Sequence, residues 1–207
     1  MLRNALSKIT VALLSLPLPQ SCTTPDYQPR DGDIIFQIST SEVGRAVQRV
    51  TGSKYSHMGI VFILGGQPQV YEGVGPVKQT PLAEWIARGD QHHYIVKRLH
   101  NSNVVLDTSG LSKMLKVGET FQGRDYDYCF EWSDERFYCS ELVWKIYQRA
   151  LGIEVGELQH IRQFDLGHPE VQALISRRCP DLEARADTVI SPAAIFAAPN
   201  LVTVYQH

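Results

Sequence analysis

The segment FYCSELVWKIYQRALG (Phe137–Gly152) predicts a helix that begins directly at a cysteine. Its apolar residues recur at the three- and four-residue spacings of one buried helical face: Leu142, Val143, Ile146, Tyr147 and Ala150. Gly152 is a natural C-terminal stop. Cys139 and Ser140 fall at the helix start, where unpaired backbone N–H groups and the helix dipole favour an anion. This position favours the nucleophilic thiolate of Cys139, and a cysteine packed as a small apolar residue is the alternative.

The size and composition of the chain suit one compact domain and give no reason to expect a nucleic-acid partner. The chain has 207 residues, of which 43% are hydrophobic and 20% charged, with a formal net charge of −2. A near-neutral chain without a run of Lys and Arg lacks the electrostatic footprint of nucleic-acid binding. No CxxC pair and no HExxH motif occur, so we expect no structural zinc site and no cofactor.

The N-terminus has the order of a secretory signal. Arg3 and Lys8 precede the apolar run Ile9–Leu16, which is too short to span a bilayer as a helix, and small and polar residues follow. We therefore predict a signal peptide at 1–22, a tether at 23–30 and a folded domain at 31–207. Cleavage before Cys22 with lipidation there would anchor the protein to a membrane. Ordinary cleavage nearby would leave a soluble protein, and either product would lie in the periplasm or cell envelope.

Three further cysteines lie in the predicted domain: Cys129, Cys139 and Cys179. Export permits a disulfide bond. A bond between Cys129 and Cys179 is conceivable if Cys139 stays free, although the spacing does not require it.

A predicted hairpin in the first half of the domain brings a histidine and a glutamate together. The apolar run Ile60–Leu64 predicts a strand that is buried on both faces, and the Gly65-Gly66 turn leads to the returning strand Val70–Glu72. His57 enters the first strand, and Glu72 ends the second. Antiparallel pairing places these two ends side by side, within reach of a hydrogen bond.

The remaining pattern is rich in strands early and in helices late, which predicts an α+β fold. The other expected strands are Ile34–Ile38, Tyr94–Leu99 and Leu201–Tyr205. The other expected helices end at Gly52, run from Thr80-Pro81 to Arg88, span Val104–Lys116 and Pro169–Arg178, and follow Ser191-Pro192.

Several segments together resemble one known family. They are DGDIIFQIS, YSHMGIVF, VYEGVGPVKQTPL, YDYCFEWSDERFYCSELVWKIYQ and VISPAAIF. They are similar to the YiiX-like proteins, which are circularly permuted papain-fold members of the NlpC-like superfamily of cysteine peptidases. In that family the histidine precedes the cysteine, as here, and a small antiparallel sheet packs against the cysteine helix. The resemblance implies Cys139 as nucleophile, His57 as base and Glu72 as the residue that orients the imidazole. By family analogy alone, Asp33 and Tyr55 would lie near the site.

The resemblance and the residues together predict a thiol-dependent hydrolase. Its substrate would be a peptide or a small acyl-bearing molecule, cleaved at an amide, ester or thioester bond through an acyl-enzyme. The alternative is a non-catalytic envelope module that binds a small peptide or lipid in the same cleft. A metal site at the same three residues would need a further ligand that the sequence does not supply. We expect the cleft to be bordered by the turn Asp31–Asp33 and by aromatics of Tyr126–Trp132.

Overall fold

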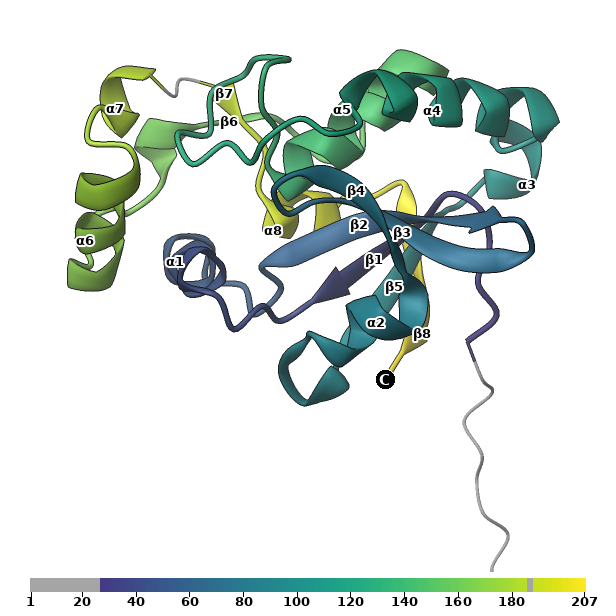
Figure 1. Cartoon of the computed structure of the whole chain (residues 1–207), viewed down its shortest axis with the longest axis horizontal. Helices are drawn as coiled ribbons and strands as arrows, with labels where there is room; N and C mark the ends of the chain where they lie inside the picture. Colours follow the sequence, from purple (N-terminus) through teal and green to yellow (C-terminus); the bar gives the residue numbers. More distant parts are fainter. Residues whose placement is uncertain (1–26, 186–187) are drawn as a thin grey trace, which may run out of the picture.

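A six-stranded antiparallel sheet forms the centre of the computed structural model, which describes residues 27–185 and 188–207 (Figure 1). The strands lie in the order β4-β3-β2-β1-β5-β8. Their bounds are Asp33–Gln37 for β1, His57–Leu64 for β2, Gln67–Gly73 for β3, Val77–Pro81 for β4, Tyr94–Leu99 for β5 and Leu201–Gln206 for β8. The predicted signal peptide and the first half of the predicted tether lie outside the described residues, so those assignments stay predictions.

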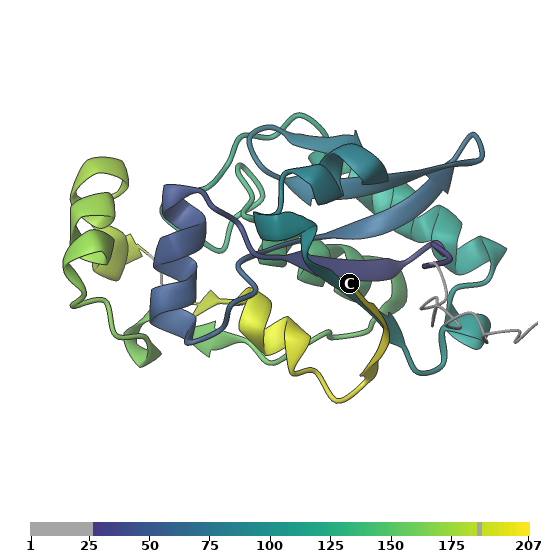
Figure 2. The same ribbon diagram turned by 90° about the horizontal axis from the view of Figure 1, so that it is seen from below.

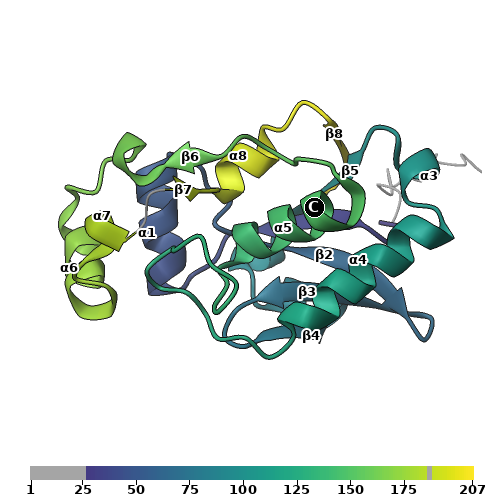
Figure 3. The ribbon, with the colours of Figure 1, turned by 90° about the horizontal axis from the view of Figure 1, so that it is seen from above.

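Helices cover both faces of this sheet. Helix α5 (Cys139–Leu151) and helix α4 (Thr108–Phe121) lie across one face, and α2 (Leu82–Ala87) packs on the other (Figures 1 and 3). Alternate strand residues divide between the two layers, because successive side chains of a strand point to opposite faces. Ile60 and Phe62 join the core under α5, whereas Val61 packs with the core under α2. The apolar run of β2 is therefore buried on both faces, as predicted.

A second group of helices lies beyond one end of the sheet. Helix α1 (Glu42–Thr51) begins at Ser41, whose side chain accepts a 3.0 Å hydrogen bond from Gly44 N, and ends at a left-handed Gly52. On its far side from the sheet lies α6 (Pro169–Arg178), followed by α7 (Leu182–Arg185) (Figure 2). The remaining elements are η1 (Asp90–His92), α3 (Ser102–Val105), β6 (Gln159–His160), η2 (Ile161–Gln163), β7 (Thr188–Val189) and α8 (Pro192–Phe196).

A disulfide bond ties this outer group to the segment that leads into α5. Cys129 and Cys179 are joined, with their Cα atoms 5.2 Å apart, and Cys139 is the free cysteine of the described residues. The bond is buried with Ile161, Leu182 and the rest of a small apolar cluster. The pairing that export made conceivable is therefore present.

Two predicted elements differ in the structure. The helix expected at Val104–Lys116 is broken, because Asp107 accepts a 2.7 Å hydrogen bond from Gly110 N and starts α4 as a new helix. Thr80-Pro81 was predicted to cap α2, but both residues belong to strand β4, and the Pro81 cap has no side-chain hydrogen bond. Among the described residues, no helix is long and apolar enough to cross a membrane.

Candidate active site

Strand pairing brings His57 and Glu72 together. Strands β2 and β3 pair with Ile60 opposite Tyr71, which places His57 and Glu72 near one end of the hairpin. The Nε2 atom of His57 lies 2.6 Å from Oε2 of Glu72. The Glu72 side chain is fully buried, and that of His57 is 12% exposed. His57 and Glu72, which the sequence predicts to be neighbours, therefore form a short hydrogen bond that is largely shielded from solvent.

Two further donors hold the second oxygen of Glu72. Oε1 accepts a 2.6 Å hydrogen bond from the Thr80 hydroxyl on β4 and another from Arg88, just after α2. Burial alone would raise the pKa of Glu72, but its bonds to His57 and Thr80 and the charge of Arg88 lower this pKa to about 2. Glu72 is therefore a fixed carboxylate at neutral pH.

His57 is held between Glu72, Cys139 and an aromatic ring. Its imidazole stacks on Trp85 with ring centroids 5.9 Å apart. Burial alone would lower the pKa of His57, but hydrogen bonds to Cys139 and Glu72 outweigh this effect and raise the pKa to about 9. Because Glu72 occupies Nε2, Nδ1 is the ring nitrogen left for the sulfur. The arrangement favours a protonated imidazole next to the sulfur.

The sulfur reaches His57 because the start of α5 lies against the end of β3. Cys139 is the first residue of α5 and follows Tyr138 in an extended conformation. A Cβ added to Gly73 would lie only 3.3 Å from the Tyr138 carbonyl carbon and 3.4 Å from Cys139 N. A glycine at this position lets the two backbones approach closely. Strand and helix together therefore place the cysteine at the histidine end of the hairpin.

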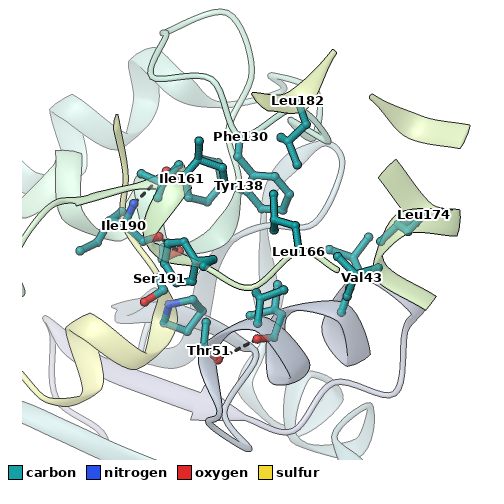
Figure 4. Close-up of a pocket in the computed structure, with 18 of the residues that line it drawn as sticks. Val43, Thr51, Phe130, Tyr138, Ile161, Leu166, Leu174, Leu182, Ile190 and Ser191 are labelled. Carbon is teal, nitrogen blue, oxygen red and sulfur yellow. Dashed lines mark hydrogen bonds between the residues drawn. The ribbon is translucent and has the colours of Figure 1, made fainter. Parts of the chain in front are cut away.

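An apolar pocket opens on one side of Cys139 (Figure 4). Its cavity volume is about 90 Å³, and Cys139, which is 4% exposed, is one of its lining residues. Apart from Cys139, the wall is mostly aliphatic and aromatic, with Val43 from α1, Phe130 and Tyr138 from the segment before α5, and Leu166, Leu174 and Leu182 from the outer group. The cysteine is buried but faces a cavity rather than solid core.

A polar cleft opens on the histidine side. Its volume is about 360 Å³. Its polar lining residues are Gln37, Ser39, Thr40, Ser41, Ser56, His57 and Arg88, together with the hydroxyl-bearing Tyr126 and Tyr128. Val43 and Tyr126 line both this cleft and the apolar pocket, so the two cavities adjoin. Cys139 lines the apolar pocket, and His57 lines the polar cleft.

The expected borders of the site are only partly correct. Tyr126 and Tyr128 line the cleft, whereas Trp132 packs against Trp144 with ring centroids 5.3 Å apart. The turn Asp31–Asp33 was predicted to border the cleft, and this was wrong. This turn leads into the start of β1. The residue of β1 that pairs with His57 is Gln37, which lies at the other end of the strand.

Asp33 and Tyr55, placed near the site by family analogy, are engaged elsewhere. Asp33 is fully buried and accepts hydrogen bonds from Arg98 and Tyr27. Tyr55 stacks on Phe196 and hydrogen-bonds to His93. Neither residue lines the apolar pocket or the polar cleft.

Sequence reasoning missed Thr80 and Arg88. Lys78 lies opposite Glu72 in the register of β3 and β4, so recognition of β4 would have placed Thr80 beside the hairpin. The strand contains three polar residues and ends in a proline, which conceals it. Arg88 gave no local signal, because it reaches Glu72 from the end of a separate helix.

A histidine strand that precedes the cysteine helix in the chain defines the permuted papain-like class of proteins. Residues 28–205 match the family model described as "Permuted papain-like amidase enzyme, YaeF/YiiX, C92 family". The chain belongs to this family, as its sequence resemblance suggested.

Two relatives in Escherichia coli support this assignment. The chain is 45% identical over 192 residues to the uncharacterized protein YiiX of strain K12, covering 93% of this chain and 94% of YiiX. It also matches the crystal structure described as metalloprotein yiiX from strain O157:H7, with a TM-score of 0.81 and 45% identity. That match covers 87% of this chain and 99% of the other.

Proposed function

We propose that this protein is a thiol-dependent amidase in which Cys139 is the nucleophile, His57 the acid–base group and Glu72 the residue that orients the imidazole. The observation that carries the proposal is the chain of contacts from Cys139 to His57 and on to Glu72, whose final hydrogen bond is 2.6 Å long. A nucleophile beside a base that is itself oriented by a third group is the signature of nucleophilic catalysis.

The proposed reaction proceeds through a thioester. The Cys139 thiolate attacks the amide carbonyl, the S–C bond forms, and the C–N bond then breaks as His57 gives its proton to the leaving nitrogen. Water, deprotonated by His57, attacks the thioester and releases the carboxylic acid. Backbone N–H groups at the start of α5 are placed to bind the developing oxyanion, an interaction that is typically worth about 10²–10³ in rate per donor.

The two cavities support an orientation for the substrate. The acyl group becomes attached to Cys139, which lines the apolar pocket, so the acyl chain would occupy that pocket. The leaving nitrogen must receive its proton from His57, which lines the polar cleft. The proposed substrate class is therefore an amide with an apolar acyl group, and esters or thioesters of the same acyl group would react by the same steps.

A binding module without turnover is the alternative from the sequence. The buried Glu72 argues against it. Three hydrogen-bond donors hold its carboxylate in place, and this carboxylate helps to raise the pKa of His57. A passive pocket has no need of a charged imidazole beside a free thiol.

A metal-dependent site does not fit the described residues. The relative of known structure is described as a metalloprotein. In the part of this chain that the structure describes, no group of three or more His, Cys, Asp or Glu side chains is arranged to hold a metal ion. Both Glu72 oxygens already accept hydrogen bonds, so no step in the proposed mechanism uses a metal.

We also propose that the protein acts outside the cytoplasm, in the periplasm or cell envelope. The signal-like segment before Cys22 supports this location, as does the Cys129–Cys179 disulfide bond, since such bonds persist in oxidising compartments. Mass spectrometry of the native protein tests it. A diacylglycerol mass on Cys22 or a new N-terminus nearby is expected, and recovery of intact Met1 from the cytoplasm would contradict it.

The amidase proposal is tested with N-octanoyl-4-nitroanilide, which releases the yellow amine 4-nitroaniline. Hydrolysis is expected with the unmodified protein, together with a thioester adduct on Cys139 that mass spectrometry detects. Cys139→Ala and His57→Ala should abolish turnover, whereas His100→Ala, a change at an exposed histidine after β5, should not. Equal turnover by the unmodified protein and Cys139→Ala would refute the proposal.

A further inference from the structure

The polar cleft is lined by cationic side chains and by no acidic one. Arg88 and His57 are its ionisable cations, and none of the described residues that line it is Asp or Glu. The guanidinium of Arg88 uses one amino group to bind Glu72, and its side chain is 35% exposed. A guanidinium has five N–H donors in a planar fork that matches a carboxylate, so most of its donors remain for a ligand.

The charges of the site nearly cancel without a substrate. Cys139 and His57 together are neutral whether the proton lies on sulfur or on the ring, and Arg88 offsets the fixed charge of Glu72. Removal of Arg88 would leave one uncompensated negative charge beside the cleft. Binding of an anionic ligand therefore depends on Arg88 in two ways. Arg88 is a direct partner for the ligand, and its positive charge offsets the negative charge of Glu72.

Gln37 is a second polar residue of this cleft. Gln37 lines the cleft and is 3% exposed, and its Oε1 has no hydrogen-bond partner among the described residues. Gln37 lies opposite His57 in the pairing of β1 with β2. The unpartnered atom is an acceptor and cannot itself bind a carboxylate, so Arg88 is the donor that this cleft offers to one.

We infer that the polar cleft is the leaving-group subsite and that it takes an amine bearing a carboxylate, which Arg88 binds. This inference rests on the proposed function, because His57 protonates the leaving nitrogen from the side of this cleft. The substrates are then N-acyl amino acids or related acyl amides, with the acyl chain in the apolar pocket. Hydrolysis releases a fatty acid and an amino acid.

Two substrates that differ only in charge test the inference. N-octanoylglycine and N-octanoylglycinamide share the acyl chain and the scissile bond. The unmodified protein is expected to hydrolyse the glycine compound with a kcat/KM about tenfold or more above that of the glycinamide, since hydrogen bonds to charged groups are worth that much. N-octanoyl-2-aminoethyl phosphate is the third substrate, and a preference for it over N-octanoylglycine would overturn the carboxylate assignment.

Variants then assign the preference to Arg88. Arg88→Gln should abolish or reverse the ratio between the two substrates, whatever it does to turnover through Glu72, and Arg88→Lys should retain part of it. Arg49→Gln is the matched control, because Arg49 lines a separate surface pocket at the end of α1. An unchanged ratio in Arg88→Gln would refute the role of Arg88.

Binding to Cys139→Ala separates this inference from the proposed function. Calorimetry with this variant should show tighter binding of N-octanoylglycine than of N-octanoylglycinamide. That preference without turnover by the unmodified protein would refute the amidase and leave the carboxylate site standing. Turnover of both compounds with equal kcat/KM and equal affinity would leave the amidase standing and overturn the carboxylate site.

Discussion

At the scale of single residues, the protonation of His57 depends on the groups that surround its ring. Its pKa is raised from 6.5 to about 9, against the effect of burial, by hydrogen bonds to Cys139 and Glu72. The imidazolium should therefore persist through neutral pH, which keeps a proton ready for the leaving group. The three hydrogen bonds on Glu72 matter because they keep the carboxylate charged beneath the ring.

The titration of His57 can be followed by NMR of labelled imidazole nitrogens. We expect a midpoint near pH 9 in the unmodified protein and a clear downward shift in Glu72→Gln, because burial then faces one stabilising partner fewer. His100→Ala assists the assignment and should leave the midpoint unchanged. A midpoint at or below pH 6.5 in the unmodified protein would contradict a protonated His57 at neutral pH.

Thiol reactivity offers a second measurement at this scale. Iodoacetamide at pH 7 should modify Cys139 but not Cys129 or Cys179, which are joined to each other. His57→Ala should slow the reaction about tenfold or more, since an unassisted thiol is only a few per cent ionised at this pH. Peptide mapping gives the rates. Equal rates in the unmodified protein and His57→Ala would refute the proposed interaction between the Cys139 sulfur and the His57 ring.

The three proposed catalytic residues could be predicted from sequence because each lies at the end of a patterned element. Cys139 begins a periodic helix, and His57 and Glu72 bound a hairpin with a glycine turn. Arg88 could not be predicted, because its partner lies 16 residues away across a strand that the pattern did not reveal. Local periodicity records burial but not contacts between separate elements.

At the scale of elements, the contact between β3 and α5 sets the position of the sulfur. Gly73→Ala would press a methyl group against backbone atoms of Tyr138 and Cys139. We expect kcat to fall on the order of tenfold with little loss of stability, since a displacement of about 1 Å can cost about 10²-fold. Gly118→Ala on α4 is the control, because its nearest neighbours are side-chain atoms of Tyr71. Unchanged kcat in Gly73→Ala would contradict this account.

The disulfide bond should stabilise the fold by closing a loop that contains α5. Cys129 and Cys179 are 50 residues apart in sequence, and closing such a loop in the unfolded chain is worth about 2–4 kcal/mol. The double variant Cys129→Ala/Cys179→Ala should lose about this free energy of unfolding in urea. A reductant should lower the midpoint of the unmodified protein but not that of the variant. No effect of the reductant on either protein would contradict the prediction.

Element prediction succeeded where a strong cap or a long apolar run was present. The bounds expected for β5 and α6 agree with the structure, and α1 ends before Gly52 as expected. It failed at β4, which is polar at three of its five positions, and at Asp107, whose cap divides a segment that is apolar on both sides. In both cases a single side-chain or edge-strand contact overrides the periodic pattern.

At the scale of the whole molecule, buried ionisable groups should give the stability a maximum in mild acid. The pKa of Glu72 is lowered to about 2, so its contribution is lost as pH falls from 4.5 through 2. Burial raises the pKa of Glu141 to about 8 although Lys145 lies 2.8 Å away. The folded protein therefore holds a proton that the unfolded chain releases above 4.5, and stability falls as pH rises to 8. His57 extends the decline from 6.5 to about 9.

Urea midpoints at pH 3, 5, 7 and 9 test this profile. The highest midpoint is expected at about pH 5, between the acidic and alkaline losses. Glu141→Gln should flatten the decline between pH 5 and 8, because it removes the titrating group. A midpoint that rises steadily from pH 5 to 9 would contradict the assignment.

Aromatic side chains near the two ends of the described chain pack against each other. Tyr27 packs on Tyr205 with ring centroids 5.5 Å apart, and the two described ends lie on the same side of the protein (Figure 1). A short linker from His207 to Tyr27 would therefore close the backbone into a ring at little cost in entropy. If this ring were opened at the Gly123 turn, the cysteine helix would come before the histidine strands in the chain. The same packed molecule would then be encoded in the order of an ordinary papain.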